Sequence, residues 1–192
     1  MNIAVLKYNA GNIRSVLYAL ERVGAEGVVT DDPELIRSAD KVIFPGVGEA
    51  SSAMAYLKDR KLDGLIRSLE QPVLGICLGM QLMCEFSEEG DTKCLGLFDK
   101  RVKRFRGNKV PQVGWNNAYD LRSPLFDRVE ENAFFYFVHS FFVEKGEYSI
   151  ALTDYEGEFS SAIQKDNFFA VQFHPEKSGR AGEQVLKNFL AL

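Results

Sequence analysis

Short apolar runs alternate with amphipathic stretches through the first half of the chain. The runs are rich in Val, Ile and Leu, as buried β-strands are, whereas the amphipathic stretches repeat their apolar residues every three or four positions, as helices do. Strands are expected at residues 2–7, 26–30, 41–46 and 72–76, and helices at residues 12–24, 32–39, 51–60, 62–69 and 78–86. This alternation predicts parallel strands with helices on both faces of the sheet.

The second half of the chain has a different pattern. From residue 95 to residue 173 it consists mostly of short strand-like segments separated by turn residues, and an amphipathic helix is expected at residues 182–192. A chain of 192 residues without a linker, an internal repeat or a low-complexity segment fits one domain with a full core. We therefore expect a single α/β domain over residues 1–192, built on an open, mixed and mainly parallel sheet.

Composition narrows the functional classes. The formal net charge of −4 argues against a surface that binds nucleic acid, and no apolar run reaches the length of a membrane span. The three cysteines, Cys77, Cys84 and Cys94, cannot all pair with one another and form no CxxC motif. With only two histidines the chain lacks the spacing of a zinc site, so we expect no metal, and a reducing compartment, the cytoplasm.

Cys77 lies between two glycines, where an expected strand becomes an expected helix. The segment Gly75-Ile76-Cys77-Leu78-Gly79 has the small-x-nucleophile-x-small form of a nucleophile elbow, with cysteine in place of serine. Larger side chains two positions from the nucleophile would collide with each other or with neighbouring backbone. The start of the helix would favour the thiolate, and the N–H of Leu78 would face an oxyanion. A packed cysteine in a glycine-rich strand end is the alternative interpretation.

A cysteine nucleophile needs a base, and the only histidines are His139 and His174. His174 follows a strand-like run, and Glu176 stands two residues further on. Functional groups gather beyond the carboxyl ends of parallel strands, where a histidine oriented by a carboxylate can activate a thiol. His174 is the expected base and Glu176 its orienting group, whereas His139 is expected to be structural or adjacent to substrate. Taken alone, His-Pro-Glu also fits a loop histidine beside a solvated glutamate.

A glycine-rich turn follows the strand expected at residues 41–46. In the segment Pro45-Gly46-Val47-Gly48, glycine allows backbone N–H groups to point toward a small anionic group, so a second oxyanion donor is expected there. An ordinary tight turn is the alternative. The glycines do not form the GxGxxG motif of dinucleotide-binding proteins.

Three segments in this order, "PGVGEA", "GICLGMQLM" and "VQFHPEKSG", resemble the class I (triad-type) glutamine amidotransferases, which have a flavodoxin-like α/β fold. Four further features narrow the resemblance: "NAGNIRSV", "KVPQVGWNN", "YFVHSFFV" and the serine after "HPEK". The whole set is similar to the glutaminase subunits of imidazole glycerol phosphate synthase, and it covers essentially the whole chain.

The resemblance implies a role for each matching position. Cys77 would attack the side-chain amide of glutamine, His174 would accept and return the proton, and Glu176 would orient His174. The oxyanion would be held by N–H groups of Leu78 and of the segment formed by Val47 and Gly48. The amino-acid end of the substrate would be held by four residues: Gly46, Gln81, Ser140 and Phe141. A glutamyl thioester would form and water would release glutamate. No metal or organic cofactor is implied.

The resemblance also implies a partner. Ammonia would pass into a cyclase, a (β/α)₈ barrel that forms a heterodimer with the glutaminase and makes imidazole glycerol phosphate and an aminoimidazole carboxamide ribonucleotide (AICAR) in histidine biosynthesis. Trp115 is the expected interface residue on physical grounds, because a lone tryptophan between Gly114 and Asn116 is less core-like and tryptophan anchors interfaces. Asn12, Tyr136 and Lys177 are interface candidates by resemblance alone.

The chain departs from the family pattern at Gln112, where a histidine is usual, and at Glu49-Ala50, where Ala-Phe is usual. Both departures lie where contact with a partner is expected. An alternative is therefore that the same glutaminase chemistry supplies ammonia to another acceptor, such as a surface sugar. A cysteine peptidase and a purely regulatory protein are less consistent with the complete triad and the compact amino-acid site. The basic run at residues 99–109 is expected to be a solvated hairpin rather than a contact with an acidic partner.

Overall fold

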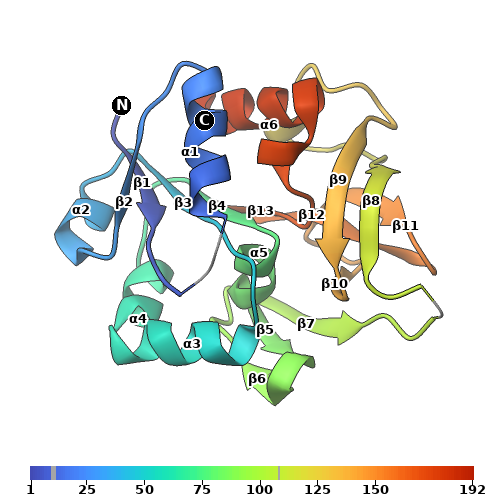
Figure 1. Ribbon diagram of the computed structural model, residues 1–192, viewed down its shortest axis with the longest axis horizontal. Coiled ribbons are helices and arrows are strands. Elements are labelled where there is room, and N and C mark those ends of the chain that lie inside the picture. The colour runs from blue at the N-terminus through green and yellow to red at the C-terminus, as the bar shows by residue number, and fades with distance from the viewer. Residues whose placement is uncertain (10–11, 108) are drawn as a thin grey trace.

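The computed structural model describes residues 1–9, 12–107 and 109–192 (Figure 1). The first half contains β1 (Ile3–Leu6), α1 (Ile13–Arg22), β2 (Gly27–Thr30), α2 (Pro33–Arg37), β3 (Lys41–Phe44), α3 (Ala50–Asp59), α4 (Leu62–Arg67), β4 (Val73–Ile76), α5 (Leu78–Met83), β5 (Cys84–Ser87) and β6 (Thr92–Lys93). The second half contains β7 (Phe98–Arg104), β8 (Gln112–Asn117), β9 (Phe134–His139), β10 (Phe141–Glu144), β11 (Ser149–Asp154), β12 (Glu158–Lys165), β13 (Phe168–Val171) and α6 (Gly179–Ala191). Short 3-10 helices cover Glu89–Asp91, Pro124–Phe126 and Pro175–Lys177.

The main sheet has the strand order β2-β1-β3-β4-β13-β12-β10-β7-β5-β6, with β11 paired to β12. The strands from β2 to β13 are parallel, and β12, β10 and β7 continue the sheet with antiparallel pairing. The last of the parallel strands, β13, pairs directly with β4, so that Val171 lies opposite Ile76. The carboxyl ends of these two strands therefore meet, although about half of the chain separates them in sequence.

Helices cover both faces of the parallel strands, as Figure 1 shows. Because successive side chains of a strand point to opposite faces, Val73 packs into the core on the side of α2 to α5, whereas Leu74 and Ile76 pack with α1 and α6. All four residues of β4 are buried, as expected for a central parallel strand. The helices follow their local signals: Asp32 accepts the N–H of Glu34 and caps α2, with Pro33 at the first helical position.

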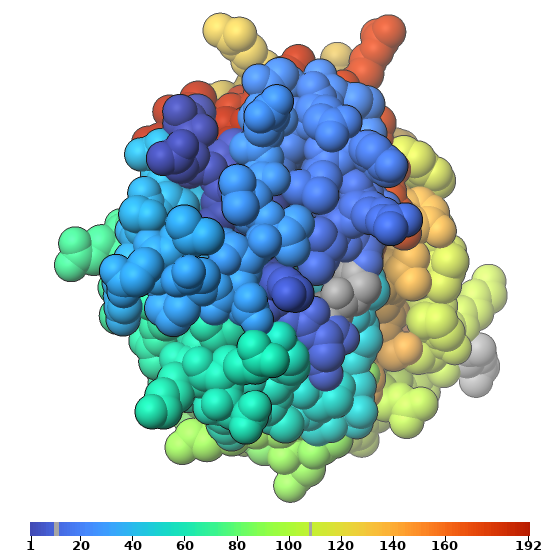
Figure 2. Space-filling model, turned by 60° about the vertical axis from the view of Figure 1, so that its left-hand side comes forward, coloured from blue at the N-terminus to red at the C-terminus, as the bar shows by residue number. Residues whose placement is uncertain are grey.

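The β8–β9 ribbon stands apart from the main sheet and pairs Trp115 with Tyr136. Its inner face buries Phe135 and Phe137 in the core, whereas its outer face exposes large apolar side chains. These exposed side chains are Val113, Trp115, Phe134 and Val138. In Figure 2 the ribbon lies along the right-hand edge of the surface that the N-terminal part of the chain forms. The expectation that Trp115 is not a core residue is confirmed.

Two expectations were wrong. The helix expected at residues 78–86 ends at Met83. The backbone adopts an extended conformation at Cys84, and β5 then pairs with β6 and β7. The apolar pattern of a short buried segment does not distinguish a helix from a strand, and here sheet pairing decides. The basic run does not form a hairpin either, because β7 pairs with β10 and β5 while β8 pairs with β9.

Candidate active site

Cys77 occupies a strained turn between β4 and α5, with φ 52° and ψ −107°. Its N–H donates to the carbonyl oxygen of Val171 at 2.8 Å, which holds the turn against the end of β13. A Cβ on Gly79 would lie 1.9 Å from the carbonyl oxygen of Phe44, and one on Gly75 would lie 2.9 Å from the sulfur of Met83. The steric reason for the two glycines is therefore confirmed: the turn has no room for larger side chains at these positions.

His174 and Glu176 form a buried pair directly after β13. Nδ1 of His174 lies 2.7 Å from Oε1 of Glu176, and 1% and 0% of the two side chains are exposed. The backbone N–H of His174 donates to the Tyr136 carbonyl, and the Ser178 hydroxyl donates to the His174 carbonyl while it accepts the N–H of Tyr136. The serine after "HPEK" thus fixes the histidine loop against the β8–β9 ribbon.

The charge of His174 is set by its neighbours. Burial lowers the pKa of His174, but the charge of Cys77, a hydrogen bond with Cys77 and the contact with Glu176 outweigh this effect and raise the pKa to about 10. These groups favour the protonated ring of His174, which can then give a proton to a leaving group. Because β13 pairs with β4, the His174–Glu176 pair and Cys77 follow adjacent strand ends.

A cavity of about 290 Å³ opens at Cys77. Seven residues expected at the site line it: Val47, Gly48, Cys77, Leu78, Gln81, Ser140 and Phe141. Four others also line it: Glu89, Pro111, Val138 and His139. Glu89 carried no signal in the sequence, because it comes from a polar turn between β5 and the edge strand β6 and reaches the cavity only through the packing of that turn on α3.

The glutamine amidotransferase class-I family model matches residues 5–192 of the chain. The chain belongs to the class-I glutamine amidotransferase family. Its relatives named "Imidazole glycerol phosphate synthase subunit HisH" include one from Bacteroides fragilis, 59% identical over 100% of both chains, and one from Haemophilus influenzae, 48% identical over 99% of this chain and 97% of the other. Sequence therefore predicted the family and the enzyme type correctly.

Solved structures of low sequence identity share the fold. A putative GMP synthase protein from Thermoplasma acidophilum has a TM-score of 0.77 at 16% identity and covers 100% of this chain and 92% of its own. PurLQS from Thermotoga maritima has a TM-score of 0.73 at 17% identity and covers 99% and 97%. The predicted fold class of this amidotransferase is thereby confirmed.

One of the expected oxyanion donors of this amidotransferase is engaged within the protein. The N–H of Leu78 donates to the carbonyl oxygen of Gly46 at 3.3 Å, a long hydrogen bond. The buried hydroxyl of Tyr8 donates to the neighbouring carbonyl of Pro45, and it occupies the space that a side chain on Gly46 would need. Gly46 therefore lies behind the cavity wall, where it positions the segment that carries Val47 and Gly48.

Gln81 can meet a substrate only through its oxygen. Its Nε2 atom donates at 3.0 Å to the carbonyl of Phe141 and at 3.0 Å to Oε1 of Gln172, which uses both of its hydrogens. The carboxylate of Glu89 lies at the start of α3, where its Oε2 atom accepts a hydrogen bond from the N–H of Ala50 at 2.8 Å. Burial raises the pKa of Glu89. The charge of Glu49 raises this pKa further, whereas the hydrogen bond from Ala50 lowers it. The cavity thus presents acceptor groups that suit an ammonium group.

Gln112, the departure from the family pattern, bonds to the second histidine. Nε2 of His139 lies 2.9 Å from Oε1 of Gln112, and Nδ1 lies 2.7 Å from the carbonyl oxygen of Phe141. Burial lowers the pKa of His139 to about 4, although the Phe141 carbonyl opposes this and His174 adds to it. A neutral ring has one N–H, so Gln112 must turn its amide nitrogen toward Nε2 when Nδ1 donates to Phe141. His139 is thus a neutral residue beside the substrate cavity.

We expect neither histidine ring to change its charge in a titration across neutral pH. With pKa values of about 4 for His139 and about 10 for His174, neither ring changes charge between about pH 5.5 and pH 8. The ring resonances in an NMR titration are expected to stay constant over this range, whereas both rings of the unfolded chain titrate near pH 6.5. An inflection near pH 6.5 from either folded ring would contradict the assignment.

His139 also makes stability depend on pH. Its pKa is lower in the folded protein than the ordinary 6.5, so the unfolded chain binds the proton more tightly between pH 6.5 and pH 4. The stability of the folded state should therefore fall as the pH falls through this window, by up to about 3 kcal/mol from this residue.

Three of the four interface candidates form one cluster. The rings of Trp115 and Tyr136 pack edge to face with centroids 5.9 Å apart, and Nζ of Lys177 lies 5.9 Å from the Tyr136 centroid. Asn12 lies elsewhere in the network: its amide donates to Oε1 of Glu176, the same oxygen that bonds to His174. Its contact in this structure is thus with the triad, and Glu176 receives two hydrogen bonds on one oxygen.

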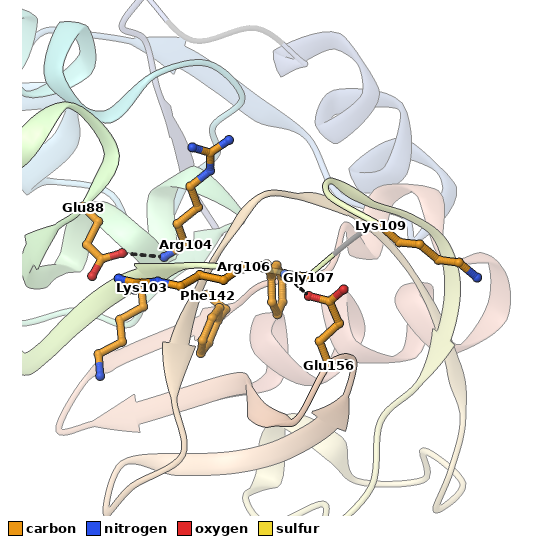
Figure 3. Close-up of a pocket in the computed structure, with 9 residues that line it drawn as sticks. Glu88, Lys103, Arg104, Arg106, Gly107, Lys109, Phe142 and Glu156 are labelled. Carbon is orange, nitrogen blue, oxygen red and sulfur yellow. Dashed lines mark hydrogen bonds between the residues drawn. The ribbon is translucent and has the colours of Figure 1, made fainter.

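A hollow of about 800 Å³, larger than the cavity at Cys77, lies beside the active site and not at it. It is an open groove lined by the basic run and by Glu88, Phe142 and Glu156. Figure 3 shows Lys103, Arg104 and Lys109 pointing in different directions, and the N–H groups of Arg104 and Gly107 donating to Glu88 and Glu156. The cations do not converge on one point, so the catalytic assignment stays with the smaller cavity at Cys77.

The described residues provide neither a metal site nor a membrane span. No group of three or more histidine, cysteine, aspartate or glutamate side chains within residues 1–9, 12–107 and 109–192 is placed to hold a metal ion. None of the helices in the same ranges has the length and apolar character needed to cross a membrane.

Proposed function

We propose that the chain is the glutaminase subunit of imidazole glycerol phosphate synthase and hydrolyses glutamine at Cys77. The observation that carries the proposal is the meeting of Cys77 with the His174–Glu176 pair at the adjacent ends of β4 and β13, beside a cavity of about 290 Å³. The similarity to HisH subunits over the full length of both chains supports this assignment to histidine biosynthesis.

Each step of the reaction has a group in this site. The Cys77 thiolate attacks the side-chain amide carbon of glutamine, and the resulting oxyanion is held by backbone N–H groups of Leu78 and of Val47 or Gly48. His174 then gives its proton to the departing nitrogen, which leaves as ammonia. His174 then takes a proton from water, which attacks the thioester carbon. The C–S bond breaks, which releases glutamate and restores the Cys77 thiolate. The Leu78 N–H becomes available only when it gives up its 3.3 Å bond to Gly46.

The amino-acid end of glutamine fits the polar wall of the cavity. The carboxylate of Glu89 and the Oε1 atom of Gln81 suit the α-ammonium group, because both accept hydrogen bonds and both line the cavity. Backbone N–H groups of Ser140 and Phe141 suit the α-carboxylate. The site needs no metal or organic cofactor for this chemistry.

The outer face of the β8–β9 ribbon is the proposed contact with a cyclase partner. Trp115 is 56% exposed at the centre of an apolar strip, and Tyr136 and Lys177 extend the strip toward the histidine loop. The partner is proposed to be a (β/α)₈ barrel that forms a heterodimer with this chain and receives its ammonia. Three buried, unpaired cysteines support a reducing compartment, the cytoplasm.

The partner can be tested by glutamate release from glutamine, measured with and without the cyclase of the same organism and its nucleotide ligand. We expect the cyclase to stimulate release about tenfold or more. Trp115→Ala should lose most of this stimulation, whereas Val28→Ala, which truncates a similarly exposed apolar side chain on β2, should keep it. No stimulation by a cyclase that is active with free ammonia would instead favour another acceptor, such as a surface sugar.

A further inference from the structure

Gln172 has no role in the steps above, yet its side chain reaches the nucleophile. The residue stands between the end of β13 and His174 and is completely buried. Its Nε2 atom lies 3.6 Å from the sulfur of Cys77, within the range of a hydrogen bond to sulfur. Its backbone N–H donates to the Ser161 carbonyl at 2.8 Å, which fixes the residue to the neighbouring strand β12.

The direction of the Gln172 amide follows from the bonds of Gln81. The carbonyl oxygen of Phe141 can only accept, so the group of Gln81 that faces it must be the amide nitrogen. The same nitrogen lies 3.0 Å from the Gln172 side chain, which must therefore present its oxygen to Gln81. It follows that Gln172 presents its NH₂ group to Cys77, so the contact with sulfur is a donated hydrogen bond.

The protonation state of Cys77 decides which contacts of the sulfur are favourable. The carbonyl oxygen of Val138, 3.7 Å from the sulfur, can accept a hydrogen bond from the thiol but repels the thiolate. Gln172 donates to the sulfur, and the charge of Cys77 raises the pKa of His174, so the His174 ring favours the thiolate as a neighbouring cation. An amide donor in a buried site strengthens as its acceptor becomes charged, because no water competes for the bond.

We propose that Gln172 is a further residue of the catalytic centre, whose side-chain N–H donates to the Cys77 sulfur and stabilises the thiolate. The bond would act before attack on glutamine and again when the sulfur leaves the thioester. Gln81 holds Gln172 in this orientation, so Gln81 contacts both the cavity and the group that supports the nucleophile. This inference deepens the proposed function, because it rests on Cys77 as the nucleophile.

The test is the pH profile of Cys77 alkylation by iodoacetamide, followed by mass spectrometry of the Cys77 peptide. Gln172→Leu and Gln172→Met remove the donor at similar volume. We expect the midpoint of the profile to rise by about one pH unit, so that the rate at any pH below the wild-type midpoint falls about tenfold. The titratable groups near the sulfur, which are His174, His139, Tyr8 and Glu89, are unchanged in both variants.

Gln71→Leu is the matched control. It removes the amide of a half-buried glutamine that donates to the Ile36 carbonyl at the opposite end of β4 from Cys77, and it should leave the alkylation profile unchanged. An unchanged profile in folded Gln172→Leu and Gln172→Met would overturn the inference while wild-type glutamate release leaves the proposed function standing. Absent glutamate release from the stimulated wild-type complex would count against the proposed function, whatever the alkylation profile.

A measurement on the wild-type protein does not depend on the folding of variants. The side-chain amide resonances of Gln172 are expected to move as Cys77 loses its proton, whereas those of Gln71 should not. Gln172 resonances that stay constant across the alkylation midpoint would overturn the inference.

Discussion

Cys77→Ala is expected to lower the rate of glutamine hydrolysis by a factor on the order of 10⁶, because no other group of the cavity can form the thioester. The substitution removes one sulfur atom from a turn whose backbone is held by the Val171 carbonyl, so the fold should be kept. The complex with the cyclase should still make its products from free ammonia. The measurements are glutamate release from glutamine and product formation from an ammonium salt.

Glu176→Gln gives a graded comparison for the same assay. It keeps the shape of the side chain but removes the charge that faces His174, so hydrolysis should slow by about 10⁴, less than in Cys77→Ala. If Cys77→Ala hydrolysed glutamine at the wild-type rate, Cys77 would not be the nucleophile. Loss of the ammonia-dependent reaction in that variant would contradict the division of labour between the subunits.

Gly79→Ala should destabilise the protein by about 3 kcal/mol or more, the largest expected effect on stability. Its Cβ would lie 1.9 Å from the Phe44 carbonyl oxygen, which is backbone at the end of β3 and cannot turn away. Either α5 or β3 must shift, and either movement displaces the Cys77 turn. Denaturant unfolding measures the loss, and glutamate release from the remaining folded protein should fall as well.

Gly64→Ala is the matched control. Gly64 lies inside α4, nothing lies within 4 Å of its added Cβ, and alanine is the better helix former. The free energy of unfolding should therefore stay constant or rise by up to about 1 kcal/mol. Equal stability of Gly79→Ala and Gly64→Ala would contradict the close approach of α5 to β3.

Local features of the sequence determined much of the fold and the centre of the site. The helix starts and strand ends of the first half follow from apolar period, from the Asp32 cap and from glycine at the Cys77 turn, because each depends on residues only a few positions apart. The same local reasoning singled out Cys77, His174 and Glu176 as the proposed triad, since a nucleophile turn and a strand-end histidine have recognisable neighbours.

Only the tertiary structure decided which distant segments meet. The place of β13 beside β4, which brings His174 to Cys77, depends on sheet pairing across the second half of the chain, and β5 became a strand for the same reason. Glu89, Gln172 and the contact of Asn12 with Glu176 were missed because a polar residue shows no local signal of what it will touch once buried. Burial then makes each such group bond to a specific partner, since an unpaired polar group in the interior is costly.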